Sequence, residues 1–384
     1  MDFRLPDDVA RLGALVREFV DREVLPLEQQ IERENAVPRA LLDRAAALGL
    51  FGITVPEVHG GTGLSALARS VVHRELARAG LGSLCSIVGA HTGIGTIGIV
   101  RTGAPELQRR YLPALAAGAK IAAYAITEPD TGSDVAGVRT RAERRGDRFL
   151  LNGTKHFITN GDLAGVITVI ARSGPRGARR DHLSALVVEP SFPGFRVARV
   201  QDTMGLRGSH IAELVFEDCE VPAENLLGRE GHGLAGALAT LAEGRVGIAA
   251  RCLGAMDRLC DLSLAYARQR VQFERPIAEF QAVQHMLADM AVDRDAARLL
   301  VSEAAWRLDQ GEDVRLQAAK VKLFASEALG RVADRAVQVH GGYGYVAELP
   351  VEKFYRDARI ARIYEGTSEI QRSIIAKGLL RSDS

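Results

Sequence analysis

Apolar positions along the chain change their spacing twice. From about residue 6 to 118 they recur every three or four residues, in one stripe at Leu12, Leu15, Val16, Phe19 and Val20 and in a second at Leu41, Leu42, Ala45 and Leu48. This spacing predicts amphipathic helices. The glycine-rich stretch PEVHGGTGLS at 56–65 interrupts the pattern and predicts a loop.

The middle of the chain, from about residue 121 to 227, has the pattern of β-strands. Short runs rich in Val, Ile and Phe, such as VITVIA, SALVVE and ELVFED, alternate with turn residues. The pairs Asn152-Gly153 and Asn160-Gly161 tolerate positive φ and predict hairpin turns. Pro193-Gly194 predicts a further turn.

After Gly231 the helical spacing returns. Long amphipathic helices are predicted at about 283–308 and 314–339, and Gly341-Gly342 is a plausible C-terminal cap of the second. A chain of 384 residues exceeds one ordinary core. We therefore predict an α+β protein with an α-helical domain at 1–120, a β-barrel-like domain at 121–228 and an α-helical domain at 229–384.

Composition narrows the class of protein. Hydrophobic residues make up 47% and charged residues 25%, which is typical of a soluble globular protein. The 49 Lys and Arg nearly balance the 48 Asp and Glu, so neither nucleic acid nor an anionic membrane is expected as a partner. No apolar run reaches the roughly 18–20 residues of a membrane span, and the acidic start MDFRLPDDVARL has no secretory signal pattern.

The cysteines and histidines indicate no metal site. Cysteines occur at 85, 219, 252 and 260 without a CxxC pair, and the nine histidines form no HxxxH motif. Reduced, partly buried cysteines are typical of a cytosolic protein, so we expect a cytoplasmic location.

One motif suggests a dinucleotide site that its context does not support. Residues 93–98, GIGTIG, match GxGxxG. A Rossmann site needs a preceding strand and an acidic residue about 20 positions later. Here the flanks are helical and the nearest acid is Glu106, so a tightly packed helix is the better interpretation.

The segment ARIYEGTSEIQR at 361–372 carries the strongest chemical signal. Glu365 follows an aromatic residue and precedes Gly366, with helical residues after them. Apolar surroundings raise the pKa of a carboxylate, as a general base near neutral pH requires. From these residues alone, a surface acid in a turn is the favoured interpretation of Glu365.

IYEGTSEIQR closely resembles the catalytic loop of the acyl-CoA dehydrogenases. The resemblance extends over nearly the whole chain and implies the acyl-CoA dehydrogenase fold, with a four-helix bundle in its C-terminal domain. It implies that Glu365 removes the substrate α-proton while the β-hydride passes to FAD, giving a trans-2-enoyl thioester. The thioester carbonyl would accept hydrogen bonds from the Glu365 N–H and from an FAD ribityl hydroxyl. Tyr364 and Gly366 would contact the substrate.

Two middle segments, YAITEPDTGSD at 124–134 and KHFITNG at 155–161, resemble flavin-binding segments of the same family. Hydroxyl donors such as Thr127 and Thr159 suit the flavin edge that becomes anionic on reduction, although β-propensity alone could explain them. Phe157, where many relatives have Trp, would cover one flavin face. The resemblance implies FAD contacts from Tyr124, Ile126, Thr127, Gly132, Ser133, Phe157, Ile158 and Thr159, and substrate contact from Ser133.

Two further segments, RVQF at 270–273 and QVHGG at 338–342, resemble family segments that reach the FAD of a neighbouring subunit. An arginine at 270 would pair with the pyrophosphate. A homodimer is thereby implied, and the family is usually a homotetramer, a dimer of dimers. The FAD contacts implied here are Arg270, Phe273, Gln281, Gln338, Val339, Gly341 and Gly342, with Thr367 and Glu369 after the catalytic loop.

The block LAEGRVGIA at 241–249 resembles the opening of the family's acyl-CoA-contacting helix and implies substrate contacts from Glu243 and Arg245. In a minority of relatives the catalytic Glu comes from the position directly before this arginine. That position is Gly244 here, and Glu243 would point about 100° away on a helix. Glu365 is therefore the predicted base.

Several functions remain compatible with these motifs. The leading one is dehydrogenation of a short or medium acyl-CoA, with an electron-transfer flavoprotein as acceptor. The same chemistry on a carrier-bound acyl or aminoacyl thioester shares the phosphopantetheine arm. An oxygen-using relative, an inactive scaffold and a NAD-linked enzyme complete the alternatives. The chain length and branching of the acyl group and the pathway stay open.

Overall fold

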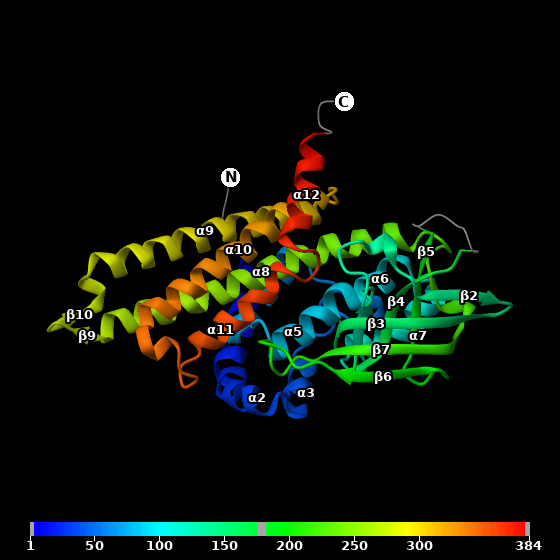
Figure 1. Ribbon diagram of the computed structural model, residues 1–384, viewed down its shortest axis with the longest axis horizontal. Coiled ribbons are helices and arrows are strands. Elements are labelled where there is room, and N and C mark those ends of the chain that lie inside the picture. Colours follow the sequence, from blue (N-terminus) through cyan, green and yellow to red (C-terminus); the bar gives the residue numbers. More distant parts are fainter. Residues whose placement is uncertain (1–3, 175–181, 381–384) are drawn as a thin grey trace.

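The computed structural model describes residues 4–174 and 182–380. Helices come first, then a β-sheet, then long helices (Figure 1). The first part contains α1 (Asp7–Phe19), α2 (Glu28–Glu34), α3 (Arg39–Ala47), α4 (Ala66–Leu76), α5 (Ser83–Ala90), α6 (Thr96–Thr102) and α7 (Pro105–Ala116). A π-helical turn, His91–Gly95, joins α5 to α6.

The middle part is one eight-stranded sheet. Its order is β6-β7-β3-β2-β4-β5-β8, and β1 pairs with β4 in parallel. The strands are β1 (Ile121–Ala125), β2 (Arg141–Arg145), β3 (Arg148–Thr159), β4 (Ala164–Arg172), β5 (Leu183–Val188), β6 (Phe195–Val200), β7 (Ile211–Pro222) and β8 (Leu226–Leu227).

The last part is dominated by three long helices that pack on one another. They are α8 (Gly233–Gln269), α9 (Gln281–Asp309) and α10 (Arg315–His340). A small hairpin of β9 (Val271–Gln272) and β10 (Arg275–Pro276) connects α8 to α9. Two shorter helices, α11 (Val351–Ala358) and α12 (Ser368–Leu379), pack against α10. The chain thus has the helical, β and helical order of the expected α+β fold.

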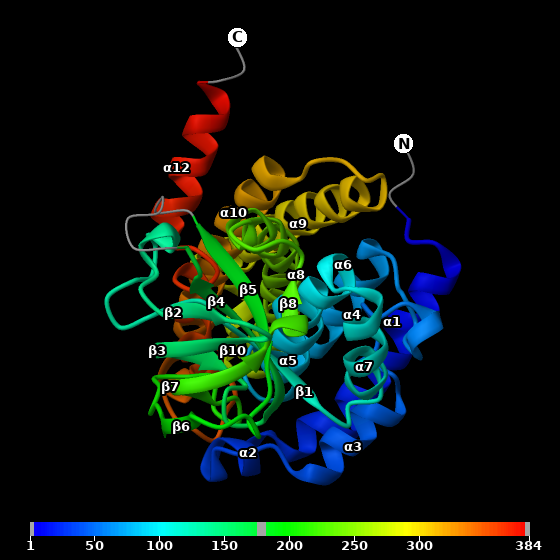
Figure 2. The same cartoon turned by 90° about the vertical axis from the view of Figure 1, so that its right-hand side faces the viewer.

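The largest apolar core joins both ends of the chain. Phe51 and Leu76 from the first part are buried in one cluster with Met256 and Leu259 of α8. The sheet has a core of its own, which includes Phe149 and other strand residues. Figure 2 shows the first helices beside the sheet, with the long helices behind them. This shared core fixes α4, α5 and α8 relative to one another, and the candidate site lies among these helices.

The structure corrects one predicted hairpin. Asn152 and Gly153 lie inside β3, and the β2–β3 turn falls between Arg145 and Arg148 instead. The Asn152 side chain bonds across to Asp218 of β7 at 2.9 Å. Gly153, with φ +148°, sits at a break in the β3–β7 register. The positive-φ signal therefore marked a bulge and not a turn.

Other local predictions fared better. A turn does follow Asn160, although the strands it joins, β3 and β4, do not pair with each other. Residues 94–98 are helical, as GIGTIG was interpreted, but Gly93 has a non-helical backbone and forms a kink between two helices. The block at 241–249 does not open a helix, because α8 begins earlier, at Gly233.

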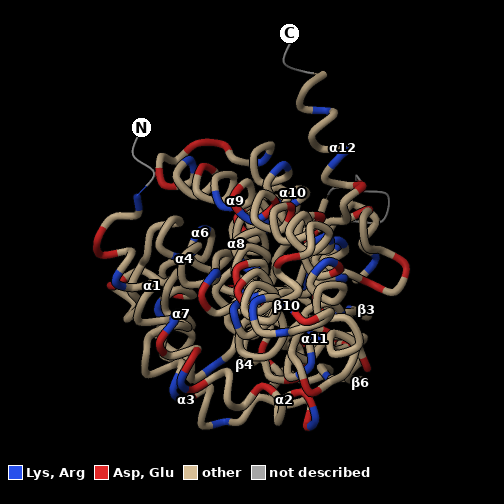
Figure 3. The backbone as a smooth tube through the Cα atoms, turned by 90° about the vertical axis from the view of Figure 1, so that its left-hand side faces the viewer, with Lys and Arg blue, Asp and Glu red and all other residues tan. Residues whose placement is uncertain are grey.

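One stretch, Ser83–Thr102, is long and apolar enough to cross a membrane by length and composition, contrary to the expectation that no such stretch exists. Within the structure, 78% of the tested window is buried. The stretch comprises α5, the π-helical turn and α6, so it packs as core helix. Lys and Arg are interspersed with Asp and Glu around the molecule (Figure 3). The four cysteines are free and buried.

Candidate active site

Glu365 lies in a tight turn that precedes α12. Its φ is +51°, and that of Gly366 is +96°. A left-handed conformation costs a non-glycine residue roughly 1–2 kcal/mol and persists only where the surroundings enforce it. The Thr367 hydroxyl caps α12 by accepting from the Ile370 N–H. This cap fixes the start of α12 directly after the strained turn.

Three side chains from three helices hold the turn by its carbonyl oxygens. Arg245 of α8 donates to the Glu365 carbonyl at 3.1 Å. Lys322 of α10 donates to the Gly366 carbonyl at 2.7 Å. Gln371 of α12 donates to both carbonyls, at 3.3 and 2.8 Å. These bonds orient the Glu365 side chain without involving its carboxylate.

The Glu365 carboxylate lies in a partly desolvated environment. Its Oε2 is buried and has no hydrogen-bond partner in the described part of the chain. Burial raises the pKa of Glu365 above its usual 4.5, and the positive charges of Arg251, Arg245 and Lys322 oppose the rise. The Tyr124 hydroxyl, also buried and unpartnered, has its pKa raised by burial and then by Glu365. The two side chains thus share one environment.

The Glu365 carboxylate lies close to the backbone of Gly244 on α8. A Cβ added at Gly244 would lie 2.2 Å from Glu365 Oε2. The carboxylate therefore occupies the space next to the α8 backbone that a side chain at 244 would take. Glu365 thus brings a carboxylate to this point, while position 244 itself contributes no side chain.

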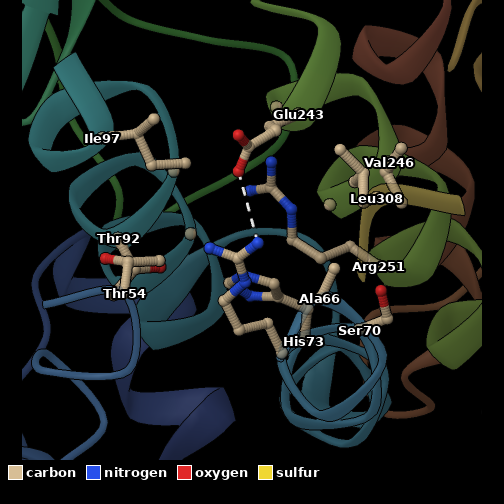
Figure 4. A pocket seen from close by; sticks show the side chains of 15 residues that line it. Thr54, Ala66, Ser70, His73, Thr92, Ile97, Glu243, Val246, Arg251 and Leu308 are labelled. Atoms are coloured by element: carbon tan, nitrogen blue, oxygen red, sulfur yellow. Dashed lines mark hydrogen bonds and ion pairs between the residues drawn. The ribbon is translucent and has the colours of Figure 1, made fainter. Parts of the chain in front are cut away.

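A cavity of about 30 Å³ begins beside Gly244 and lies between α4, the α5–α6 region and α8. Its lining is polar: Figure 4 shows Glu243, Arg251, His73 and Ser70 around the same space. Glu243 pairs with Arg69 at 3.2 Å and with Arg101. The predicted substrate residue Glu243 thus lines the cavity, while Arg245 binds the turn at Glu365.

The two predicted flavin segments lie together. Buried Lys155 on β3 donates to the Ile126 carbonyl at 2.9 Å and to the Glu128 carboxylate at 2.8 Å. The His156 N–H donates to the Thr127 carbonyl at 2.9 Å. These bonds place Thr127 beside Phe157, whose ring is 58% exposed on a left-handed backbone.

Other predicted flavin residues differ in exposure. Gly132 and Ser133 are exposed. Ile158 is 2% exposed and belongs to the sheet core, so only its backbone is available to a ligand.

Apart from Thr367 and Glu369, which follow the Glu365 turn, the remaining predicted cofactor residues lie at the far end of the molecule. The Arg270 guanidinium sits over the Tyr343 ring, 5.8 Å from its centroid, which places it beside Gly341 and Gly342. Phe273 is 87% exposed, and Val339 is buried. Figure 1 shows the β9–β10 hairpin at the opposite end from β3. One subunit therefore does not bring all predicted cofactor residues together, and the separated residues are Arg270, Phe273, Gln281, Gln338, Val339, Gly341 and Gly342.

Several site residues escaped prediction from the sequence. Lys322, Gln371 and Arg251 were not singled out, nor was the cavity face of α4. A spacing signal exists, because Ala66, Arg69, Ser70 and His73 follow at i, i+3, i+4 and i+7, as on one helix face. Gly244, Gly247 and Arg251 form a similar face on α8. Thr367 caps a helix, and Glu369 is exposed.

Comparisons with known proteins agree over the whole chain. Three family descriptions match: acyl-CoA dehydrogenase, N-terminal domain, at residues 6–119; middle domain, at 123–219; and C-terminal domain, at 231–380. An acyl-CoA dehydrogenase of Bacillus subtilis is 42% identical over 95% of this chain and 96% of its own. An acryloyl-CoA reductase (NADH) of Anaerotignum propionicum is 40% identical over 99% and 96%.

Solved structures are similar throughout. Butyryl-CoA dehydrogenase from Megasphaera elsdenii superimposes with a TM-score of 0.96 at 36% identity, covering 99% of this chain and all of that one. A chain from the structure of the electron transferring flavoprotein of Acidaminococcus fermentans gives 0.97 at 38% identity, with both chains fully covered. An acyl-CoA dehydrogenase from Bacillus anthracis, solved with FAD, gives 0.93 at 36% identity over 99% of this chain and 68% of that one. The chain belongs to the acyl-CoA dehydrogenase family.

Proposed function

We propose that this protein catalyses the FAD-dependent α,β-dehydrogenation of a saturated acyl-CoA to the trans-2-enoyl-CoA, with Glu365 as the base. The observation that carries the proposal is the Glu365 carboxylate: its Oε2 is buried, has no hydrogen-bond partner among the described residues, and belongs to a strained turn held by three side chains. Such strain is typical of active sites.

The residues of this chain account for proton removal. The ionised Glu365 carboxylate takes the α-proton, and burial favours the neutral acid that forms. The positive charges of Arg251, Arg245 and Lys322 lower the pKa of Glu365 and so favour its ionised form before the reaction. The Glu365 N–H has no backbone acceptor in the described ranges and is free to donate to the thioester carbonyl. When bound, FAD supplies the acceptor for the β-hydride.

The middle domain fits a flavin. The exposed Phe157 ring offers an apolar face, and the adjacent Thr127 and Thr159 offer hydroxyls. The buried Tyr124 hydroxyl lacks a partner and lies near Glu365, so the flavin-binding segment and the base meet. These features support FAD contacts from Tyr124 on β1 and from Thr127, just after β1. They also support FAD contacts from Phe157 and Thr159 on β3.

The distant cofactor residues support a shared site. Arg270 and the Gly341-Gly342 turn lie together but far from Phe157, and Phe273 is exposed beside them. We therefore propose a homodimer in which this end completes the FAD site of a second copy, and a homotetramer of two such dimers. An electron-transfer flavoprotein is proposed as acceptor, in line with the similarity to the A. fermentans chain. The buried, free cysteines fit a cytoplasmic location.

An anaerobic titration tests the function. The purified, yellow protein is mixed with a panel of saturated acyl-CoAs, and bleaching of the flavin absorbance is expected with at least one of them. Glu365→Gln should retain FAD and bind the same acyl-CoA while losing nearly all turnover. Glu143→Gln, an exposed change on β2, is the matched control and should be fully active.

Three results would contradict the proposal. Substantial turnover by Glu365→Gln would show that Glu365 is not the base. A colourless protein that cannot take up FAD would argue for an inactive scaffold. A yellow protein that ignores every acyl-CoA would point to a carrier-bound thioester.

A further inference from the structure

The cavity next to Glu365 contains more charge than an unbranched alkyl chain requires. Gly244 lines the cavity, and a Cβ at Gly244 would meet the Glu365 carboxylate, so the cavity lies next to the proposed base. Arg69, His73, Glu243 and Arg251 all line it. An alkyl group placed here would face ionised and polar atoms in a dry space, where each unsatisfied group costs about 1–3 kcal/mol.

Arg251 is the charge that lacks a carboxylate in contact. It comes from α8, is 5% exposed, and forms no ion pair within the described ranges 4–174 and 182–380. Its Nε has no hydrogen-bond partner there either. The guanidinium lies against Gly89 of α5, where a Cβ would come within 2.5 Å of one terminal nitrogen. Its ring contact is with Tyr364, 6.0 Å from the centroid.

The other cations near the cavity are already paired. Glu243 bonds to Arg69 and pairs with Arg101, so both of its oxygens face guanidinium groups. Asp309, which accepts from the Ala66 and Leu67 N–H groups at the start of α4, adds negative charge near Arg69. Tyr364 and Cys85 act on the pKa of Arg251 more strongly than Glu365, which is the carboxylate among the causes and becomes neutral once it has taken the α-proton.

Neutral polar atoms around Arg251 are also without partners. Thr54 Oγ1 and His73 Nδ1 are buried and make no hydrogen bond in the part of the chain that the structure describes. Burial, followed by the charges of Arg251 and Arg69, lowers the pKa of His73 to about 3, so this ring is neutral. Three orphaned polar groups, on α8, α4 and the segment before α4, thus line one small cavity. A ligand with several acceptor atoms would satisfy them.

We propose that the acyl group of the substrate carries a carboxylate at its far end, held by the Arg251 guanidinium, with Thr54 and His73 as neighbouring hydrogen-bond partners. This inference rests on the proposed function and names its substrate class: the CoA monothioester of a short dicarboxylic acid. A guanidinium binds a carboxylate through two parallel hydrogen bonds. The cavity of about 30 Å³ admits only a few atoms beyond the reacting carbons, since one water needs about 10–15 Å³.

The test compares thioesters that differ only in the terminal group. Anaerobic bleaching and steady-state turnover are measured with succinyl-, glutaryl- and adipyl-CoA against butyryl-, pentanoyl- and hexanoyl-CoA. We expect kcat/KM for one dicarboxylic thioester to exceed that of its monocarboxylic match on the order of tenfold to hundredfold, the usual worth of a buried charged hydrogen bond. Preference for the monocarboxylic series would overturn the inference and leave the proposed function intact. Bleaching by neither series would contradict the proposed function itself.

Substitution of Arg251 distinguishes binding of the substrate's terminal carboxylate from an effect of Arg251 on the pKa of Glu365. Arg251→Gln should remove the dicarboxylic preference, mainly through KM, and Arg251→Lys should retain part of it. Arg109→Gln, an exposed change on α7, is the matched control. If Arg251 only tunes Glu365, both thioester series lose kcat/KM equally and the acid limb of the pH profile moves to higher pH, which would overturn the inference. If Arg251→Gln does not fold, the comparison of dicarboxylic with monocarboxylic thioesters on the wild-type protein still tests the inference.

Discussion

Adding one methyl group at Gly244 should disable the enzyme without unfolding it. The new Cβ would lie 2.2 Å from Glu365 Oε2 and 3.0 Å from the Ile94 side chain. Carbon and oxygen in contact stay roughly 3.2 Å or more apart, so the carboxylate must retreat by about 1 Å. Because that carboxylate is the end of a flexible side chain, the retreat costs little folding energy. A displacement of about 1 Å in a reacting group costs on the order of 100-fold in rate.

The assay measures kcat with the best acyl-CoA, FAD content by absorbance, and the thermal midpoint. For Gly244→Ala we expect kcat to fall about 100-fold, with FAD content unchanged and the midpoint the same or slightly higher, since Ala favours a helix over Gly by about 1 kcal/mol. Gly236→Ala on the same helix is the control, because its Cβ would meet nothing within 4 Å.

A double mutant sharpens the test. If the methyl acts only through the base, Gly244→Ala combined with Glu365→Gln should be no less active than Glu365→Gln alone. Wild-type turnover by folded, FAD-loaded Gly244→Ala would refute the reasoning, because it would mean that the carboxylate does not work from the position next to Gly244.

Other predictions follow from the same contacts. Because burial raises the pKa of Glu365 and the base must be ionised, kcat/KM should fall as pH decreases through a pKa above 4.5; an acid limb at or below 4.5 in a pH–rate profile would argue against an enclosed base. Lys322→Met removes the 2.7 Å bond to the Gly366 carbonyl, so kcat should drop at least tenfold, and unchanged kcat at pH 7 would show that Gln371 suffices. Gly153→Ala should lower the free energy of unfolding in urea by about 2 kcal/mol or more, because its φ is +148° and its Cβ would lie 2.5 Å from Thr140; a loss below 0.5 kcal/mol would show that the bulge relaxes.

Much of the fold could be predicted from local sequence. The repeat of apolar residues predicted α9 and α10 to within about two residues at each end, because a helix that buries one face requires that spacing whatever it packs against. The stop at Gly341 was predicted for the same kind of reason: its φ of +58° suits glycine. The Asn152-Gly153 pair misled, because an Asn-Gly pair signals positive φ, and a bulge satisfies that requirement as well as a turn does.

The candidate base was also within reach of the sequence, since the motif around Glu365 is contiguous. Its environment was not. Arg245 and the Glu365 carbonyl are 120 positions apart, and Lys322 is 44 positions from Gly366. Such contacts depend on how α8, α10 and the turn pack together, and helical spacing says only which residues share a face.

The sequence by itself therefore determined the order of helices and strands and the family-like motifs, and it pointed to Glu365 as the candidate base. Tertiary structure decided that Gly244 faces the Glu365 carboxylate, and that Arg251 enters the same cavity without a carboxylate in contact. The physical reason is that burial and charge pairing arise between segments far apart in the chain. Whether a buried arginine is paired can be known only when its neighbours in space are known.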